Sequence, residues 1–336
     1  MTDASVITQS AYPRTRLPKS SEGPLTPAGA ATPGALTLRD LGKLKITLQT
    51  LSGRTAIRAD LCASGLYRGE VEDSMPFPRL QLFELEDLAW FPHTIRDLAT
   101  DYLHFMETRF ALHKPVIPLL RAMLKDSKTS QVVDLCSGGG GPMLAIYESL
   151  VASGIRVRIT LTDKYPNLEA FARLSSLYPS DILYIANSVD ATKVPRELIG
   201  LRTMFNSFHH FVPNRARAVL ECAVEAQQPI CIFEIPERSL VMMLPFVFTP
   251  IYVALATPFI QPFRWKRLLW TYLIPLIPLT CWWDGIVSQC RAYTVVEMLD
   301  LTQGLSGYDW KAARVDIHGK PGHVTYLRGI PISPNV

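Results

Sequence analysis

The residues with the clearest capacity for chemistry lie in segment 132–142, which reads Val-Val-Asp-Leu-Cys-Ser-Gly-Gly-Gly-Gly-Pro. Four consecutive glycines after a short apolar run let the backbone approach a ligand closely, because glycine has no Cβ. Pro142 is typical of the first turn of a helix, and the free N–H groups at such a helix start bind polar ligands. The segment therefore predicts a ligand-binding loop between a buried strand and a helix.

Two carboxylates accompany this loop: Asp134 precedes the glycines, and Asp163 ends the next apolar segment. A carboxylate at Asp134 would repel a dinucleotide pyrophosphate and attract a ligand amino group. An acid at Asp163 is placed to accept hydrogen bonds from ribose hydroxyls. A Walker A loop is excluded, because Pro142 and Met143 stand where Lys and Ser or Thr are required. The pattern favours a ligand with a cationic group and a ribose.

Alternating strand-like and helix-like segments position these residues. The predicted strands are 131–135, 156–162, 182–185, 201–206 and 229–234, and the predicted helices between or after them are 142–152, 168–177 and 216–226. This alternation predicts an α/β fold with a Rossmann-like, mostly parallel sheet and helices on both faces. Two last strands, near 311–317 and 323–328, have a short Gly/Pro link that suits only an antiparallel hairpin. We therefore expect a terminal antiparallel strand.

The loop, the acids and the reversed strand together resemble the class I S-adenosylmethionine-dependent methyltransferases, over about residues 130–330. The first motif of that family reads acid-x-Gly-x-Gly-x-Gly. Segment 134–140 here reads Asp-Leu-Cys-Ser-Gly-Gly-Gly, with Cys136 in place of the first glycine. The resemblance implies a methyltransferase with S-adenosyl-L-methionine as its cofactor.

The resemblance also implies roles at matching positions. Asp134 and the backbone of residues 138–140 would face the methionine part of the cofactor, Asp163 would hold the ribose, and Asp190 would lie beside the adenine. The full set of expected cofactor-binding residues is Asp134, Cys136, Ser137, Gly138, Gly139, Gly140, Asp163, Asp190, Ala191 and Asn206.

The fourth predicted strand runs into Phe-Asn-Ser-Phe-His-His-Phe at 205–211. Strand ends on this side of an open α/β sheet form the ligand crevice. A histidine with a near-neutral pKa takes a proton readily from a substrate hydroxyl, so His209 and His210 are candidate catalytic residues. The alternative is that both histidines only cap or pack the following helix, since methyl transfer also proceeds by proximity and alignment alone.

Weaker candidates for substrate contact are Glu234, after the fifth strand, and Tyr102 and Arg109 in the preceding helical region. Glu234 has an alternative role as the ion-pair partner of Arg238 or Arg291. No group of Cys and His has the spacing of a zinc site, so no metal is expected.

A hydrophobic insertion interrupts the alternation of strands and helices. Segment 240–260 has no charged residue, and a second uncharged run, 268–283, follows Arg264, Lys266 and Arg267. The first run is long enough to cross a bilayer, but Pro245, Pro250 and Pro258 argue against a straight helix.

Three interpretations of the insertion remain open: shallow membrane insertion, a two-pass hairpin, and a soluble lid or homodimer contact. A two-pass hairpin would place the basic residues 264–267 across the membrane from a cytoplasmic catalytic domain, against the positive-inside rule. We expect membrane association through 240–283 with the catalytic domain in the cytoplasm. An apolar roof over the crevice would select an apolar acceptor, so a lipophilic small molecule methylated at oxygen or carbon is predicted.

The chain as a whole has 336 residues, of which 48% are hydrophobic and 19% charged, with a net charge of +4. So small and scattered an excess of basic residues does not indicate nucleic-acid binding. The predicted order is a disordered tail at 1–36, an N-terminal helical cap at 37–128 with a helix-like stretch at 41–51, a cofactor-binding core at 129–239, the insertion at 240–285 and the rest of the core at 286–332.

Two other functions remain open. One is a non-catalytic membrane-bound scaffold. The other is a nicotinamide oxidoreductase, which is less favoured because Met143 stands where the dinucleotide-binding pattern Gly-x-Gly-x-x-Gly has its third glycine.

Overall fold

The computed structural model describes residues 46–51, 54–59, 77–317, 319 and 322–332, so the predicted tail at 1–36 lies outside the described residues. The chain divides into two compact units, Met1–Glu70 and Val71–Val336. In the first unit, β1 (Ile46–Leu51) and β2 (Arg54–Ala59) form an antiparallel hairpin. The helix expected at 41–51 is therefore wrong over 46–51. Apolar residues alternate with polar ones over Ile46–Gln49, and this period of two suits a strand.

The second unit is built on a seven-stranded sheet of order β5-β4-β3-β6-β7-β9-β8. Its strands are β3 (Gln131–Leu135), β4 (Arg158–Leu161), β5 (Ile182–Tyr184), β6 (Leu201–Phe205), β7 (Ile230–Glu234), β8 (Tyr308–Asp316) and β9 (His323–Pro331). Strands β3 to β7 are parallel, and β9 runs antiparallel to both β7 and β8. The predicted mostly parallel sheet with a reversed last strand is confirmed. The reversed strand β9 lies between β7 and β8, and β8 forms the edge of the sheet.

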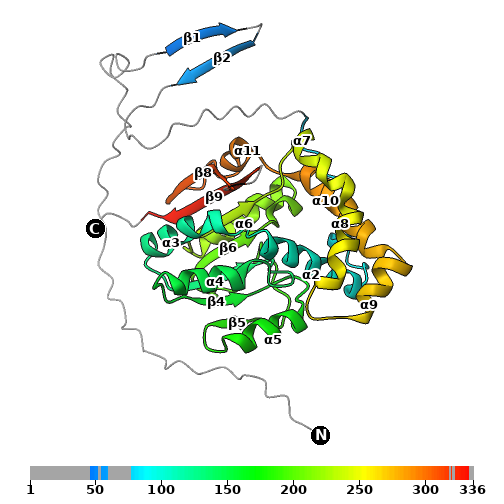
Figure 1. Cartoon of the computed structure of the whole chain (residues 1–336). Coiled ribbons are helices and arrows are strands. Elements are labelled where there is room, and N and C mark those ends of the chain that lie inside the picture. The colour runs from blue at the N-terminus through cyan, green and yellow to red at the C-terminus, as the bar shows by residue number, and fades with distance from the viewer. Residues whose placement is uncertain (1–45, 52–53, 60–76, 318, 320–321, 333–336) are drawn as a thin grey trace, which may run out of the picture. The chain divides into compact units, whose positions relative to one another are not determined.

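Helices cover both faces of this sheet (Figure 1). The helices on one face are α3 (Ile117–Asp126), α4 (Met143–Ala152) and α5 (Leu168–Leu177), and those on the other are α6 (Pro213–Glu225) and α11 (Val295–Asp300). The side chains of consecutive strand residues point to opposite faces of the sheet: Val132 packs in the hydrophobic core of the first face and Val133 in that of the second. Burial on both faces explains why these strands read as short continuous apolar runs.

The region before the sheet contains η1 (Leu85–Asp87), α2 (His93–Arg109) and η2 (Lys114–Val116). The apolar side of α2 does not face the sheet. Ile95, Leu98 and Tyr102 pack instead against Val253 and Ile277 of the insertion, in a separate hydrophobic cluster. This leaves the polar side of α2 free to lie over the ends of the strands.

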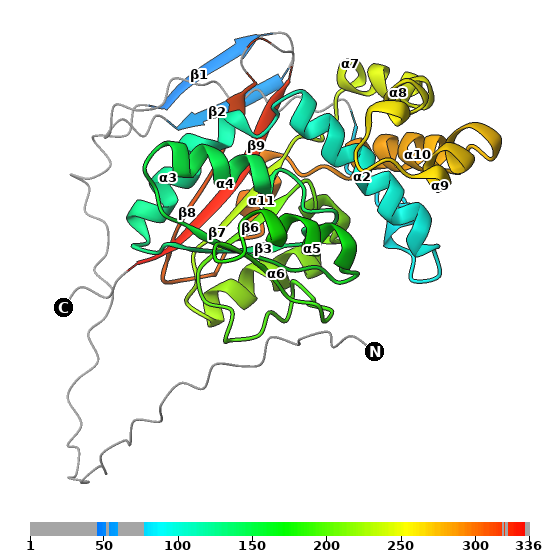
Figure 2. The ribbon, with the colours of Figure 1, turned by 60° about the horizontal axis from the view of Figure 1, so that its bottom comes forward.

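The insertion forms a group of short helices. They are α7 (Leu240–Met243), η4 (Leu244–Phe248), α8 (Thr249–Ala256), η5 (Thr257–Phe259), α9 (Trp265–Leu268), η6 (Leu269–Leu273) and α10 (Leu276–Arg291). Prolines occupy the first turns of η4, α8 and η5, as expected for residues that break a continuous helix. Helix α10 runs past the boundary expected at 285. In both views the insertion and α2 gather at one end of the sheet (Figure 1 and Figure 2).

The basic segment between the two apolar runs is bonded to helices α2 and α5. Arg267, only 2% exposed, donates a hydrogen bond from Nη2 to Oδ2 of Asp101 on α2 over 2.6 Å. Arg264 reaches Oε1 of Glu169 on α5 at 2.7 Å. A two-pass hairpin would separate both arginines from these carboxylates.

Candidate active site

A cavity of about 680 Å³ lies at the carboxyl ends of β3, β4, β5 and β6. Most of the expected cofactor-binding residues line it: Cys136, Ser137, Gly138, Gly139, Asp163, Asp190, Ala191 and Asn206. Asp134 and Gly140 are absent from the lining. The parallel sheet therefore brings together residues that are up to 70 positions apart in the sequence, at the edge where an open α/β sheet binds ligands.

Asp134 is buried beneath the glycine loop, with 2% of its surface exposed. Its Oδ2 accepts a hydrogen bond from Oγ of Ser137, and its Oδ1 accepts one from Oγ1 of Thr203, both at 2.7 Å. Burial raises the pKa of this carboxyl to about 7, and the two hydroxyl bonds oppose the rise. Asp134 thus fixes the first turn of the loop from below, and its side chain does not reach the cavity.

The glycine loop has the left-handed backbone that glycine accepts without cost. Gly140 has a φ of 97°, and a Cβ there would lie 2.1 Å from Cδ1 of Leu174 on α5. Its role is close packing against that helix. Cys136, where the family motif has its first glycine, also has a positive φ, of 57°. Cys136 therefore has a backbone conformation that glycine adopts readily.

Asp163 connects the end of β4 to the glycine loop. Its Oδ2 accepts the N–H of Gly138 and its Oδ1 accepts the N–H of Tyr165, each at 2.7 Å. Each carboxylate oxygen has a second lone pair, and the side chain lines the cavity. Asp163 is therefore able to accept further hydrogen bonds from a ligand while it holds the loop.

Asp190 and Ala191 form the cavity wall beyond β5. Asp190 accepts hydrogen bonds from the N–H and hydroxyl of Thr192, at 2.9 and 2.6 Å, and from Arg215 at 2.9 Å. Burial raises the pKa of Asp190, but the bonds from Thr192 and Arg215 outweigh it and hold the pKa below the usual value. This wall presents an ionised acid beside a small apolar side chain.

Helix α2 crosses the glycine loop with one polar face, made of Thr100, His104 and Glu107. Thr100 Oγ1 lies 3.4 Å from the place that a Cβ on Gly139 would take. His104 Nδ1 donates to the carbonyl oxygen of Gly141 over 2.5 Å. Glu107 Oε1 accepts a 2.6 Å hydrogen bond from Nδ2 of Asn206. These three residues also line the cavity.

Sequence reasoning missed this polar face. Its signal was the spacing 100, 104 and 107, which places three polar residues on one side of a helix. The candidates chosen instead lie elsewhere. Tyr102 is buried in the cluster with the insertion, and Arg109 is exposed and does not line the cavity.

His209 and Glu234 form a buried pair behind the cavity wall. His209 Nδ1 lies 2.5 Å from Oε2 of Glu234, whose Oε1 accepts the N–H groups of Ser207 and Phe208 at 2.9 and 2.7 Å. Neither member of the pair lines the cavity. Glu234 therefore positions the turn after β6, and its ion-pair partner is His209 and not Arg238 or Arg291.

His210 does line the cavity. Its Nδ1 lies 2.8 Å from Oδ1 of Asp87 and 3.3 Å from Oε2 of Glu84. Burial lowers the pKa of His210, but Glu84 and Asp87 outweigh it and raise the pKa to about 10. At neutral pH this side chain is an imidazolium, which cannot accept a proton, so the geometry favours a fixed positive charge over a general base.

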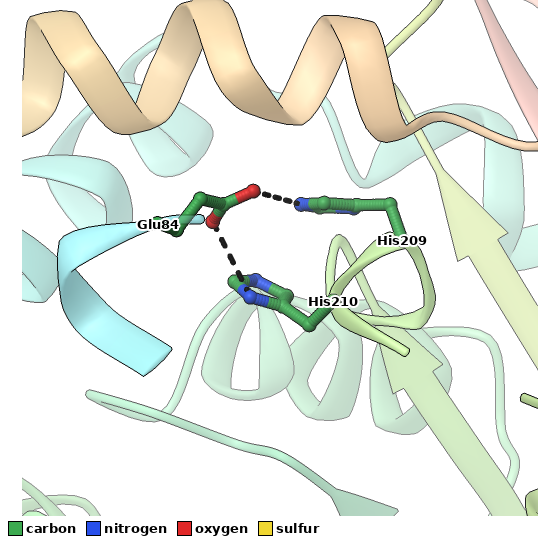
Figure 3. Close-up of side chains that lie close together, drawn as sticks. All are labelled: Glu84, His209 and His210. Carbon is green, nitrogen blue, oxygen red and sulfur yellow. Dashed lines mark ion pairs between the residues drawn. The ribbon is translucent and has the colours of Figure 1, made fainter. Parts of the chain in front are cut away.

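The rings of His209 and His210 stack on each other, and Glu84 faces both from one side with one carboxylate oxygen toward each, as Figure 3 shows. One potential ligand atom from each of Glu84, His209 and His210 lies within 4.8 Å of the others, a separation that a metal ion could bridge. However, Arg291 Nη1 is 3.2 Å from Oε1 of Glu84 and 2.7 Å from Oδ2 of Asp87. The guanidinium already supplies the positive charge there, and the geometry is that of an ion-pair network balanced within the protein.

No family model matches the chain, and no curated protein matches its sequence. Similar solved structures include the methyltransferase domain of bacterial CtHen1-CN, 16% identical with a TM-score of 0.40, covering 65% of this chain and 99% of that one. Magnesium protoporphyrin IX methyltransferase from Synechocystis PCC 6803 is 9% identical with a TM-score of 0.37, covering 65% and 83%. A zinc-dependent alcohol dehydrogenase from Rhodobacter sphaeroides is 12% identical with a TM-score of 0.36, covering 60% and 84%. Such low scores assign neither an activity nor a cofactor to this chain.

Proposed function

We propose that this protein binds S-adenosyl-L-methionine and transfers its methyl group to a lipophilic small molecule. The observation that carries the proposal is the charge around the glycine loop. Asp163 accepts the N–H of Gly138, and Glu107 Oε2 lies 3.8 Å from where a Cβ on Gly141 would be. A dinucleotide pyrophosphate at this loop would be repelled by both carboxylates, whereas a ligand with cationic sulfonium and ammonium groups would be attracted.

The residues present fit this cofactor. The backbone of Gly138 and Gly139 allows close approach, Asp163 has lone pairs for ribose hydroxyls, and Asp190 with Ala191 offers an edge for the adenine. When bound, the cofactor supplies a methyl group on a positively charged sulfur, which an acceptor oxygen or carbon takes by direct displacement. The chain orients the two ligands and excludes water between them. The proton of an acceptor hydroxyl would pass to water, and the positive charge of His210 would stabilise the oxygen that remains.

The exposed apolar residues of the cavity lining, which we call its mouth, support a lipophilic acceptor. Leu82, Phe83 and Leu103 line the cavity and are exposed. The ring of Phe83 lies 5.4 Å from that of Trp283 on α10, so the mouth is continuous with the insertion. The insertion does not roof the cavity as expected, since none of the lining belongs to 240–283. Helix α2 and the segment around η1 lie in between.

The insertion itself supports contact with a membrane surface. Segment Leu240–Phe259 is long and apolar enough to cross a bilayer by length and composition, and only 22% of its most apolar stretch is buried. Trp265 and Leu273 are 76% and 75% exposed, and Lys266 beside them is exposed. Exposed apolar surface of this kind marks a membrane or protein contact, and Trp with Lys is typical of a bilayer interface. We propose shallow insertion with the catalytic domain in the cytoplasm.

The proposal is tested by incubating the full chain with methyl-labelled S-adenosylmethionine and a membrane lipid extract. We expect label to enter an organic-phase product, and Asp163→Asn to reduce the transfer about 10-fold or more, as for loss of a charged hydrogen bond. Transfer only to charged, water-soluble acceptors would contradict a lipophilic substrate. Cofactor binding without any transfer would favour a non-catalytic scaffold.

A further inference from the structure

Helix α2 places the carboxylate of Glu107 beside Gly141 of the glycine loop. It lines the cavity, and its Oε1 accepts a hydrogen bond from Asn206. The amide of Asn206 cannot turn round freely, because its Oδ1 accepts the N–H of Ile235 at 2.9 Å. Asn206 therefore fixes the carboxylate and leaves Oε2, which accepts no hydrogen bond among the described residues, next to Gly141.

The charge of Glu107 is not compensated within the described part of the chain. Neither Lys nor Arg forms an ion pair with it there, whereas Asp190 and Asp87 each have an arginine partner. Burial raises the pKa of Glu107 to about 7; the bond from Asn206 lowers it and the charge of Asp134 raises it. Glu107 is half-buried, and a carboxylate partly withdrawn from water without a cation is unfavourable, so a cationic group on a ligand would complete this part of the site.

Asp134 cannot supply this contact. Both of its oxygens are bonded to hydroxyls under the loop, and its side chain does not line the cavity. Asp163 lies on the other side of the loop, at the end of β4, where it bonds the N–H of Gly138. Glu107 is thus the carboxylate placed over the far end of the loop, beside Gly141 and the start of α4.

We propose that Glu107, oriented by Asn206, binds the ammonium group of the amino-acid part of the cofactor. This inference rests on the proposed function, because it takes S-adenosylmethionine as the ligand. It assigns the recognition of the amino-acid part to α2, outside the parallel sheet, and recognition of the adenosine part to Asp163, Asp190 and Ala191.

The test compares two ligands that share the adenosine and the sulfur and differ in the amino-acid part. S-adenosylhomocysteine has the amino-acid part, and 5′-methylthioadenosine has the same adenosine and sulfur without it. We expect Glu107→Gln to weaken the binding of S-adenosylhomocysteine about 10- to 100-fold, the range for a lost charged hydrogen bond. Binding of methylthioadenosine to the same variant should stay within about twofold, because adenosine contacts are unchanged. Calorimetric titration measures both.

Two controls separate the possible outcomes. Glu225→Gln, at the exposed end of α6, removes the same charge away from the cavity and should leave both affinities unchanged. Normal methylthioadenosine binding by Glu107→Gln shows that this variant is folded. Equal weakening of both ligands, or no weakening of either, would overturn the role of Glu107 alone. Failure of the unaltered chain to bind either ligand would overturn the proposed function, and this inference with it.

Discussion

At Cys136 the backbone has the conformation of a glycine although the residue has a side chain, with a φ of 57°. We expect Cys136→Gly to keep cofactor binding within about twofold, because glycine adopts this conformation without strain. Cys136→Val should lower the free energy of unfolding by about 1–3 kcal/mol, since a β-branched residue is strained at positive φ. Thermal unfolding and calorimetric titration of both variants check this. Unchanged stability in Cys136→Val together with lost cofactor binding in Cys136→Gly would contradict this prediction.

The charge of His210 predicts a pH dependence of stability. Glu84 and Asp87 raise its pKa to about 10 in the folded protein, so its stabilising contribution is complete below about pH 6.5, the unfolded value. That contribution is lost as pH rises through 10. The neighbours Glu86 and Asp284, with pKa values raised to about 8 and about 7, act in the same direction at lower pH.

The unfolding temperature should therefore fall between pH 8 and 10 in the unaltered chain and fall less in His210→Gln. The nearby carboxyls are largely ionised only above about pH 9, because the pKa of Glu86 is about 8, so the upper half of this window isolates His210. Arg291 and His209, the other charged or titratable neighbours, are present in both proteins. Identical pH profiles for the two proteins would show that His210 does not carry this charge.

At the scale of elements, Asp101 and Arg267 join α2 to α9 through a pair that is buried on both sides. Arg267 also donates to the carbonyl oxygens of Ile260 and Pro262. We expect Asp101→Asn to cost about 3–5 kcal/mol, because a buried guanidinium loses its partner. The double variant Asp101→Leu with Arg267→Met should recover much of that loss. Thermal unfolding and limited proteolysis of the insertion measure both, and a neutral single variant would contradict the contact.

Elements with a local signal could be predicted from the sequence. Strand β3 and helix α5 have the predicted bounds, because the apolar run of the strand and the Asn167 cap of the helix are local features. The parallel sheet and its reversed strand followed from the order of such segments. The strand at 46–51 was missed because apolar spacing over a short run was taken for a helix.

The parts of the site that depend on long-range packing could not be predicted. Burial of Asp134 depends on Thr203, which is 69 residues away in the sequence, and the place of Glu107 depends on how α2 crosses the loop. Asp163 was found because the end of a parallel strand fixes the edge to which a side chain belongs, and Asp190 was assigned by the resemblance to the class I methyltransferases. The high pKa of His210 arises from residues on a different segment, 84–87, which carried no motif.

At the scale of the whole molecule, the exposed apolar insertion predicts binding to lipid. The full chain should float with vesicles that contain anionic lipid, and Trp265→Glu with Leu273→Glu should weaken this binding at least about 10-fold, since charge at the interface is unfavourable. Val151→Glu changes an apolar residue, 45% exposed, on α4 and should have no effect. Equal binding by all three proteins would contradict a membrane contact through the insertion and favour a homodimer surface.

The central claim is that the cavity at the ends of β3 to β6 holds an adenosyl cofactor with a cationic amino-acid part. The most direct test is calorimetric titration of the full chain with S-adenosylmethionine, S-adenosylhomocysteine and NAD, alongside Asp163→Ala. We predict that both adenosyl ligands bind, that NAD does not, and that the substitution weakens binding about 10-fold or more through loss of ribose hydrogen bonds. Binding of NAD alone would contradict the account.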